Sequence, residues 1–162
     1  GLAEALAAEL RALAARWPPG PIDAAAAAAV QQLRAEADLR GLHRPRLGDA
    51  AGAEAPLAAG TVIVDPEPAF RPAPGLRTVR VHPLPELGRL PEVLAPWRGR
   101  LQGVALAGVA EAAAAERLAA ALTALGVSRI APPGELQRPD ALWHNGGASP
   151  LAALTTSGSA RS

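Results

Sequence analysis

The side chains best suited to chemistry gather in one stretch of the chain, residues 127–147. A short β-branched run, Val127 to Ile130, leads into a segment rich in proline and glycine that holds Trp143, His144 and the chain's single asparagine, Asn145. Connections held by a rigid scaffold are where binding and catalytic groups concentrate, and a histidine can donate or accept a proton near neutral pH. His144 is therefore the candidate acid or base. The alternative is a structural loop in which the indole of Trp143 covers part of the core.

Other reactive arrangements are missing from the sequence. There is no cysteine, which excludes a disulfide, a thiolate metal site and a cysteine nucleophile within these residues. His43, His82 and His144 stand far apart without a second ligand at metal spacing, so no metal site is predicted. His82 precedes Pro83 and is typical of a turn. No Gly-Xaa-Ser-Xaa-Gly elbow occurs, and Gly108, alone at a strand-to-helix turn, is weak evidence for a phosphate site.

Composition sets the remaining limits. At 162 residues the chain has the size of one domain, long enough to bury a core. All 16 basic residues are arginines, interspersed among 15 acidic ones, so no basic block predicts nucleic-acid binding. The absence of a leader-like segment and of an uninterrupted apolar span predicts a soluble, cytoplasmic protein without a membrane span. Because it has no methionine, even at position 1, the chain is expected to be a processed product or a fragment.

Hydrophobic periodicity and turn residues indicate the elements that position the loop. Helices are predicted at residues 2–16, 24–40, 85–94 and 109–125. Strands are predicted at residues 61–64, 78–81, 101–108 and 127–130. Asp23 is the expected N-cap of the second helix and Gly41 its C-terminal stop, Pro91 is expected to divide the third helix, and residues 41–60 are expected to form a surface loop.

The last three elements determine the fold class. Strand, helix and strand at this spacing make a βαβ unit, which requires parallel strands with a right-handed crossover. The predicted fold is therefore α/β, an open, mainly parallel sheet flanked by helices. From the chemistry of the residues alone, the sequence supports only an α/β domain with one decorated loop.

The order of the motifs resembles that of a known family. The segments at residues 70–83, 94–104 and 125–139, followed by Trp-His-Asn-Gly-Gly at 143–147, are similar to the long-chain acyl-CoA reductases, the fatty-acid reductases of bacterial bioluminescence and their non-luminous relatives. The family ends with a Pro-Xaa-Gly-Xaa-Xaa-Gln-Xaa-Pro loop and a Trp-His-His-Asp-Gly-like signature. Asn145-Gly146 replaces the usual His-Asp here, and residues 155–158 are less polar and aromatic than the family's ending. Both departures are features of a degenerate or truncated copy, which is the alternative to an intact family member.

The resemblance implies a catalytic-domain portion of an aldehyde-dehydrogenase-like fold. Such enzymes accept an acyl group from acyl-CoA or an acyl-carrier thioester onto a cysteine and reduce it to the aldehyde with NADPH, sometimes as homo-oligomers. Thioester exchange needs a thiolate, so the nucleophile and the cofactor-binding half are expected upstream, and no catalytic residue is expected in this chain. Residues 1–154 would then be a partial catalytic domain and residues 155–162 a disordered tail.

By position, the resemblance assigns the loop after Ile130 to the substrate tunnel. The candidates for lining or bracing the acyl pocket are Gly134, Gln137, Pro139, Trp143, His144 and Gly147. Two alternatives stay open beside the reductase: a non-catalytic α/β remnant or interaction module that retains the fold, and an aldehyde dehydrogenase that works in the oxidative direction.

Overall fold

The computed structural model describes residues 1–45 and 56–138, and the chain divides into two compact units, Gly1–Pro85 and Glu86–Ser162. The first unit contains the helices α1 (Leu2–Arg16) and α2 (Ala24–Leu39), the 3₁₀ turn η1 (Leu57–Ala59) and the strands β1 (Thr61–Val64) and β2 (Thr78–Val81). The second contains η2 (Leu87–Arg89), α3 (Leu90–Leu94), η3 (Ala95–Trp97), β3 (Gly103–Ala105), α4 (Ala112–Ala124) and β4 (Arg129–Ala131).

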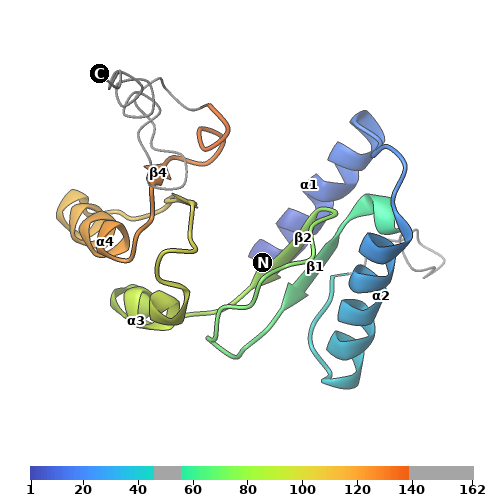
Figure 1. Cartoon of the computed structure of the whole chain (residues 1–162), viewed down its shortest axis with the longest axis horizontal. Coiled ribbons are helices and arrows are strands. Elements are labelled where there is room, and N and C mark those ends of the chain that lie inside the picture. The colour runs from blue at the N-terminus through green and yellow to red at the C-terminus, as the bar shows by residue number, and fades with distance from the viewer. Residues whose placement is uncertain (46–55, 139–162) are drawn as a thin grey trace, which may run out of the picture. The chain divides into compact units, whose positions relative to one another are not determined.

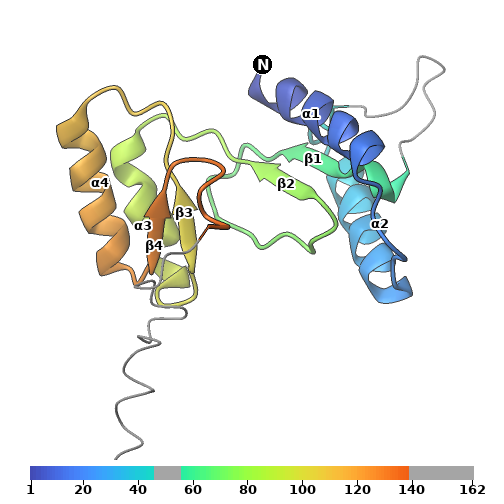
Figure 2. The same cartoon turned by 90° about the horizontal axis from the view of Figure 1, so that it is seen from above.

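Strand β1 is the centre of the first unit (Figure 1). It pairs with β2 in parallel, with Thr61 opposite Thr78. Because successive side chains of a strand point to opposite faces, Val62 packs with α1 and Ile63 with α2. Figure 2 shows the two helices on either side of the strand pair. Val62 and Ile63 are both buried, and each contributes roughly 1.5–3 kcal/mol by leaving water.

The start of α2 confirms the predicted cap. The carboxylate of Asp23 accepts hydrogen bonds from the N–H groups of Ala25 at 2.8 Å and Ala26 at 3.0 Å. The alanine run that follows has the highest intrinsic helix propensity. Beyond the C-cap, Gly41 takes a φ of +64°, the left-handed conformation in which glycine commonly ends a helix.

Replacing Asp23 by alanine should lower the free energy of unfolding by about 1 kcal/mol, because two N–H groups in the first turn of α2 lose their acceptor. Urea unfolding followed by circular dichroism measures the change. Asp23→Asn keeps a side-chain oxygen and is the matched control. An equal loss in both variants would contradict the capping role.

The second unit contains the predicted βαβ arrangement. Strands β3 and β4 are parallel, with Gly103 opposite Arg129, and α4 connects them in sequence. Leu118 and Leu122 of α4 are buried, as is Val127 before β4. These buried side chains anchor α4 in the second unit, where the helix contacts α3.

The α/β class with parallel strands is confirmed, but several details differ from the prediction. The described strands form two separate two-stranded sheets, β1–β2 and β3–β4, instead of one open sheet. Strands β3 and β4 span only three residues each, since Gly103 and Ala105 have little side chain to bury. The helix expected over 85–94 is η2 followed by α3, and Pro91 lies in the first turn of α3, where its missing N–H costs no helical hydrogen bond.

Within residues 1–45 and 56–138, no helix has both the length and the apolar character needed to cross a membrane. Residues 46–55 of the expected surface loop and the expected tail at 155–162 lie outside the described residues.

Candidate functional site

A buried carboxylate marks the carboxyl end of the first strand pair. Asp65 directly follows β1 and is 0% exposed. Two terminal nitrogens of Arg40, at the end of α2, donate to its two oxygens at 3.1 and 3.2 Å, and the N–H of Glu67 donates to Oδ1 at 3.1 Å. Such a two-pronged arginine–carboxylate contact is strong and directional. It ties the end of α2 to the end of β1.

Exposed charges extend this contact into a network. The carboxylate of Glu67 lies 2.6 Å from Arg71 and 3.4 Å from Arg40. The carboxylate of Glu36 lies 3.6 Å from each of the same two arginines. These four side chains are between 31% and 46% exposed, so each pair contributes at most about 1 kcal/mol.

A row of polar side chains runs along β2 on the face that also holds Ile63. We call Thr78, Arg80 and His82 the polar row. Alternate residues of a strand share a face, and Arg80 is the register partner of Ile63, so the row lies on the face of Ile63. The side chain of Arg80 is 10% exposed, and its Nη1 lies 3.7 Å from Oδ2 of Asp65, too far for a hydrogen bond. Thr78 Oγ1, Arg80 Nε and His82 Nε2 are buried without a hydrogen-bond partner. An unsatisfied buried polar atom costs about 1–3 kcal/mol.

The tautomer of His82 follows from its contact with the backbone. Its Nδ1 lies 2.7 Å from the carbonyl oxygen of Glu67. Because a carbonyl can only accept, Nδ1 carries the proton, and in the neutral ring Nε2 is an acceptor. His82 is half-buried and belongs to the polar row. The sequence predicted only a turn residue before Pro83, whereas the structure adds a hydrogen bond from its Nδ1 to the backbone of Glu67.

Acid should weaken the first unit through Asp65. Burial by itself raises the pKa of Asp65, but hydrogen bonds from Arg40 and the Glu67 N–H, with the charges of Arg40 and His82, hold that pKa below its ordinary value. A carboxyl with a lowered folded-state pKa stabilises the fold above its unfolded pKa, about 3.9, and loses this contribution as the pH falls through the folded-state pKa. The urea midpoint should therefore fall on acidification below about pH 4. An Asp65→Asn variant with the same pH slope as the wild type would contradict this.

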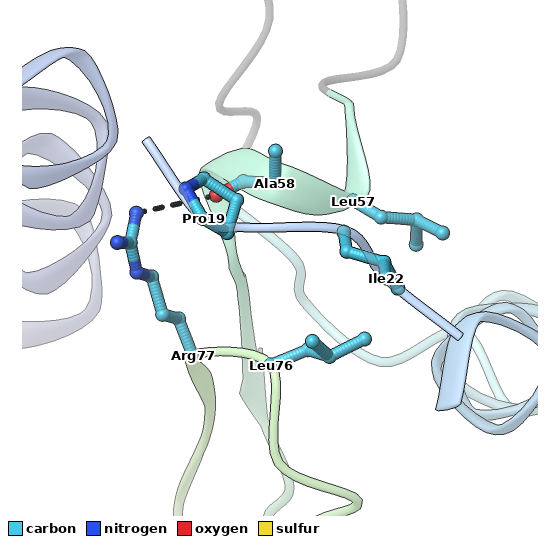
Figure 3. Close-up of a pocket in the computed structure, with 6 residues that line it drawn as sticks. All are labelled: Pro19, Ile22, Leu57, Ala58, Leu76 and Arg77. Atoms are coloured by element: carbon cyan, nitrogen blue, oxygen red, sulfur yellow. Dashed lines mark hydrogen bonds between the residues drawn. The ribbon is translucent and has the colours of Figure 1, made fainter. Parts of the chain in front are cut away.

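A small apolar pocket lies at the amino end of the same strands (Figure 3). Its cavity volume is only about 20 Å³, and it is lined by Pro19, Ile22, Leu57, Ala58, Leu76 and Arg77. Pockets for substrates or cofactors usually measure about 300–1,000 Å³. This one is too small to hold a long acyl group and is part of the packing of the first unit.

The turn that forms one wall of this pocket is strained. Leu76 and Arg77 have φ values of +48° and +56°, a conformation that costs a residue with a side chain about 1–2 kcal/mol. The Thr78 N–H donates to the carbonyl of Gly75 at 3.0 Å and closes the turn. Arg77 donates to the carbonyls of Ala58 (dashed in Figure 3) and of Trp17 after α1. These contacts hold the strained turn against α1 and η1.

Gly60→Ala should be destabilising by about 2 kcal/mol. Gly60 has a φ of +95°, and an added Cβ would lie 2.9 Å from the backbone oxygen of Arg77, so both strain and a clash arise next to β1. Gly88→Ala is the matched control, because nothing lies within 4 Å of its added Cβ. Thermal unfolding measures the midpoint temperature of both variants. Equal midpoints would show that the amino end of the β1–β2 pair is not closely packed.

The loop predicted to line the acyl pocket is described only up to Arg138. Gly134 has a φ of +88°, and both it and Gln137 are exposed on the turn after β4. Arg129 holds this turn by donating to the carbonyls of Glu135 at 3.0 Å and Arg138 at 2.7 Å. The other candidates, Pro139, Trp143, His144 and Gly147, lie outside the described residues.

The predictions from sequence missed the polar row and the buried Asp65. One signal was present: in Thr78-Val79-Arg80-Val81, the valines alternate with polar residues, which predicts one apolar face and one polar face. What covers the polar face depends on contacts distant in sequence. In the described part of the chain, no group of three or more histidine or acidic side chains is placed to hold a metal ion.

Two parallel strand pairs packed with helices define an α/β protein, a class that hosts many unrelated enzymes. A family model described as Acyl-CoA reductase (LuxC) matches residues 1–157. The chain therefore belongs to the acyl-CoA reductase (LuxC) family, and the resemblance to that family is confirmed. No curated protein and no solved structure matches the chain.

Proposed function

We propose that this chain supplies part of the catalytic domain of an NADPH-dependent acyl-CoA reductase. The observation that carries the proposal is the family match over residues 1–157. A cysteine thiolate attacks the thioester carbonyl, and CoA leaves as its thiol after taking up a proton. For the reduction of the acyl-enzyme to the aldehyde, with release of the cysteine thiolate, NADPH bound in another part of the enzyme would supply the hydride. Since this chain contains no cysteine, we assign the nucleophile to another part of the enzyme.

The described part of the chain does not fit a dinucleotide. A strand-to-helix turn that binds a pyrophosphate needs closely spaced glycines and helix N–H groups near the phosphates. The turn between β3 and α4 has one glycine, Gly108, and α4 begins only at Ala112. We therefore assign the NADPH site to another part of the enzyme as well.

Residues of the loop after β4 are the proposed contribution to substrate binding. Gln137, Trp143 and His144 would line or brace the acyl pocket, with Gly134, Pro139 and Gly147 shaping the backbone. Of these residues, Gly134 and Gln137 lie on a turn that Arg129 holds by two hydrogen bonds. In the intact reductase, Trp143→Ala and His144→Ala should raise KM for long-chain acyl-CoA by about tenfold. Unchanged kinetics together with lowered stability would leave these residues a structural role only.

The decisive experiment is turnover by the intact enzyme that contains this chain. NADPH oxidation that depends on acyl-CoA, with aldehyde as product and loss of activity when the cysteine is replaced, is the expected result. Acyl-carrier thioesters are compared with CoA thioesters in the same assay. Oxidation of aldehyde with NAD and no reduction of acyl-CoA would make the enzyme an oxidative aldehyde dehydrogenase. Turnover in neither direction would leave a non-catalytic α/β module.

A further inference from the structure

Arg80 is a cation without a hydrogen-bonded acceptor. Its side chain is nine-tenths buried, since 10% is exposed. Within the described part of the chain no hydrogen bond from its guanidinium is found: Nη1 is 3.7 Å from Asp65, and Nε is buried without a partner. Both oxygens of Asp65 accept hydrogen bonds from Arg40, and Oδ1 also accepts from the N–H of Glu67, whereas Arg80 stays at ion-pair distance from Oδ2.

Arg80 has no acceptor of its own. In the described part of the chain its one ion-pair partner is Asp65, whose oxygens are hydrogen-bonded to Arg40 instead. The neighbouring acids Glu36 and Glu67 are 45% and 46% exposed and pair with Arg40 and Arg71. A desolvated guanidinium without an acceptor is unfavourable, and an oxyanion is the group that satisfies it best.

Thr78 in β2 and His82 directly after it add polar groups suited to the same ligand. Thr78 and His82 lie two residues before and after Arg80, which places them on the same face of the strand. Thr78 Oγ1 and His82 Nε2 are buried without partners, like Arg80 Nε. A hydroxyl, a guanidinium and an imidazole can all contact phosphoryl oxygens: the first two donate, and the neutral Nε2 accepts from a protonated phosphate oxygen.

We propose that the polar row binds a phosphoryl group, with Arg80 as its anchor and Thr78 and His82 beside it. Two sources fit this chemistry: free phosphate, and a phosphate of CoA. The assignment to CoA rests on the proposed reductase function, whereas the assignment of an anion site to Arg80 does not.

Calorimetric titration of the full 162-residue chain tests the proposal in phosphate-free buffer. The ligands are inorganic phosphate, CoA, and dephospho-CoA, which lacks the 3′-phosphate. The wild type should bind phosphate, and Arg80→Gln should bind it about tenfold or more weakly. Arg89→Gln removes an exposed arginine, 61% accessible and paired with Glu92, and should bind like the wild type.

A stability measurement separates binding from a structural role of Arg80. If Arg80 serves a ligand, Arg80→Gln should be as stable as the wild type or more stable without phosphate, and only the wild type should gain stability when phosphate is added. Thr78→Ala and His82→Gln should each weaken binding by a smaller factor than Arg80→Gln. No binding by the wild type, or equal binding by Arg80→Gln, overturns the proposal. The proposal is also overturned if Arg80→Gln is less stable than the wild type and phosphate does not change the stability of the wild type.

The CoA titrations identify the source of the phosphoryl group. Tighter binding of CoA than of dephospho-CoA, lost in Arg80→Gln, assigns the 3′-phosphate of CoA to the polar row. Phosphate binding at Arg80 without CoA binding supports the anion site with free phosphate as its ligand. Neither result decides the reductase proposal, which depends on turnover of acyl-CoA by the intact enzyme.

Discussion

Asp65→Asn should lower the free energy of unfolding by about 3–5 kcal/mol, a large part of the roughly 5–15 kcal/mol that stabilises a small domain. The substitution keeps the shape of the side chain but removes the charge that faces two arginines. One prong of the Arg40 contact then meets an amide NH₂ group in place of an oxygen.

Urea unfolding measures this loss, and an exposed ion pair provides the control. Glu92 is 74% exposed and lies 3.6 Å from Arg89, so Glu92→Gln should change the free energy of unfolding by less than about 1 kcal/mol. Combining Asp65→Asn with Arg40→Gln should cost less than the sum of the two single changes, because the double variant leaves one fewer buried charge unpaired. A loss below about 1 kcal/mol for Asp65→Asn would contradict its role as the anchor of α2.

Leu122→Ala should cost about 2–5 kcal/mol. Leu122 is 0% exposed and lies in the second half of α4, where truncation leaves a cavity in a core made of few large side chains. Leu87→Ala is the control, since Leu87 is 47% exposed, and its truncation should cost well under 1 kcal/mol. Equal losses in the two variants would mean that α4 does not depend on this contact.

Hydrogen exchange measured on peptides assigns each loss to its own unit. Asp65→Asn should increase exchange within residues 1–45 and 56–85, where its partners lie, and Leu122→Ala within residues 86–138. The two variants thereby report separately on the compact units Gly1–Pro85 and Glu86–Ser162.

Local signals predicted most of the elements correctly. Asp23 before an alanine run fixed the start of α2, and the order of strand, helix and strand predicted the βαβ unit, because both depend on neighbours in sequence. The separation of the strands into two sheets could not be predicted in this way. Strand pairing is decided by contacts between distant residues, and short strands with small side chains, such as β3, give weak patterns.

The site could be predicted less well than the fold. The loop candidates were chosen for their residue types, and the two that are described, Gly134 and Gln137, are exposed on a turn, which neither supports nor opposes a pocket. Asp65 shows why the rest was missed. Its partner Arg40 is 25 positions away in sequence, and an aspartate followed by proline is ordinarily a turn signal, so nothing local distinguished a buried anchor from a surface turn.

The connection between β1 and β2 has a consequence for the unfolded chain. Parallel strands are usually joined through a helix, but residues 65–77 join β1 to β2 without one. This connection contains four prolines, Pro66, Pro68, Pro72 and Pro74. Each proline that suits the folded conformation reduces the freedom of the unfolded chain, worth about 0.4–1 kcal/mol. The stability of this strand pair therefore depends partly on a stiff tether that keeps its two strands from separating widely before they pair.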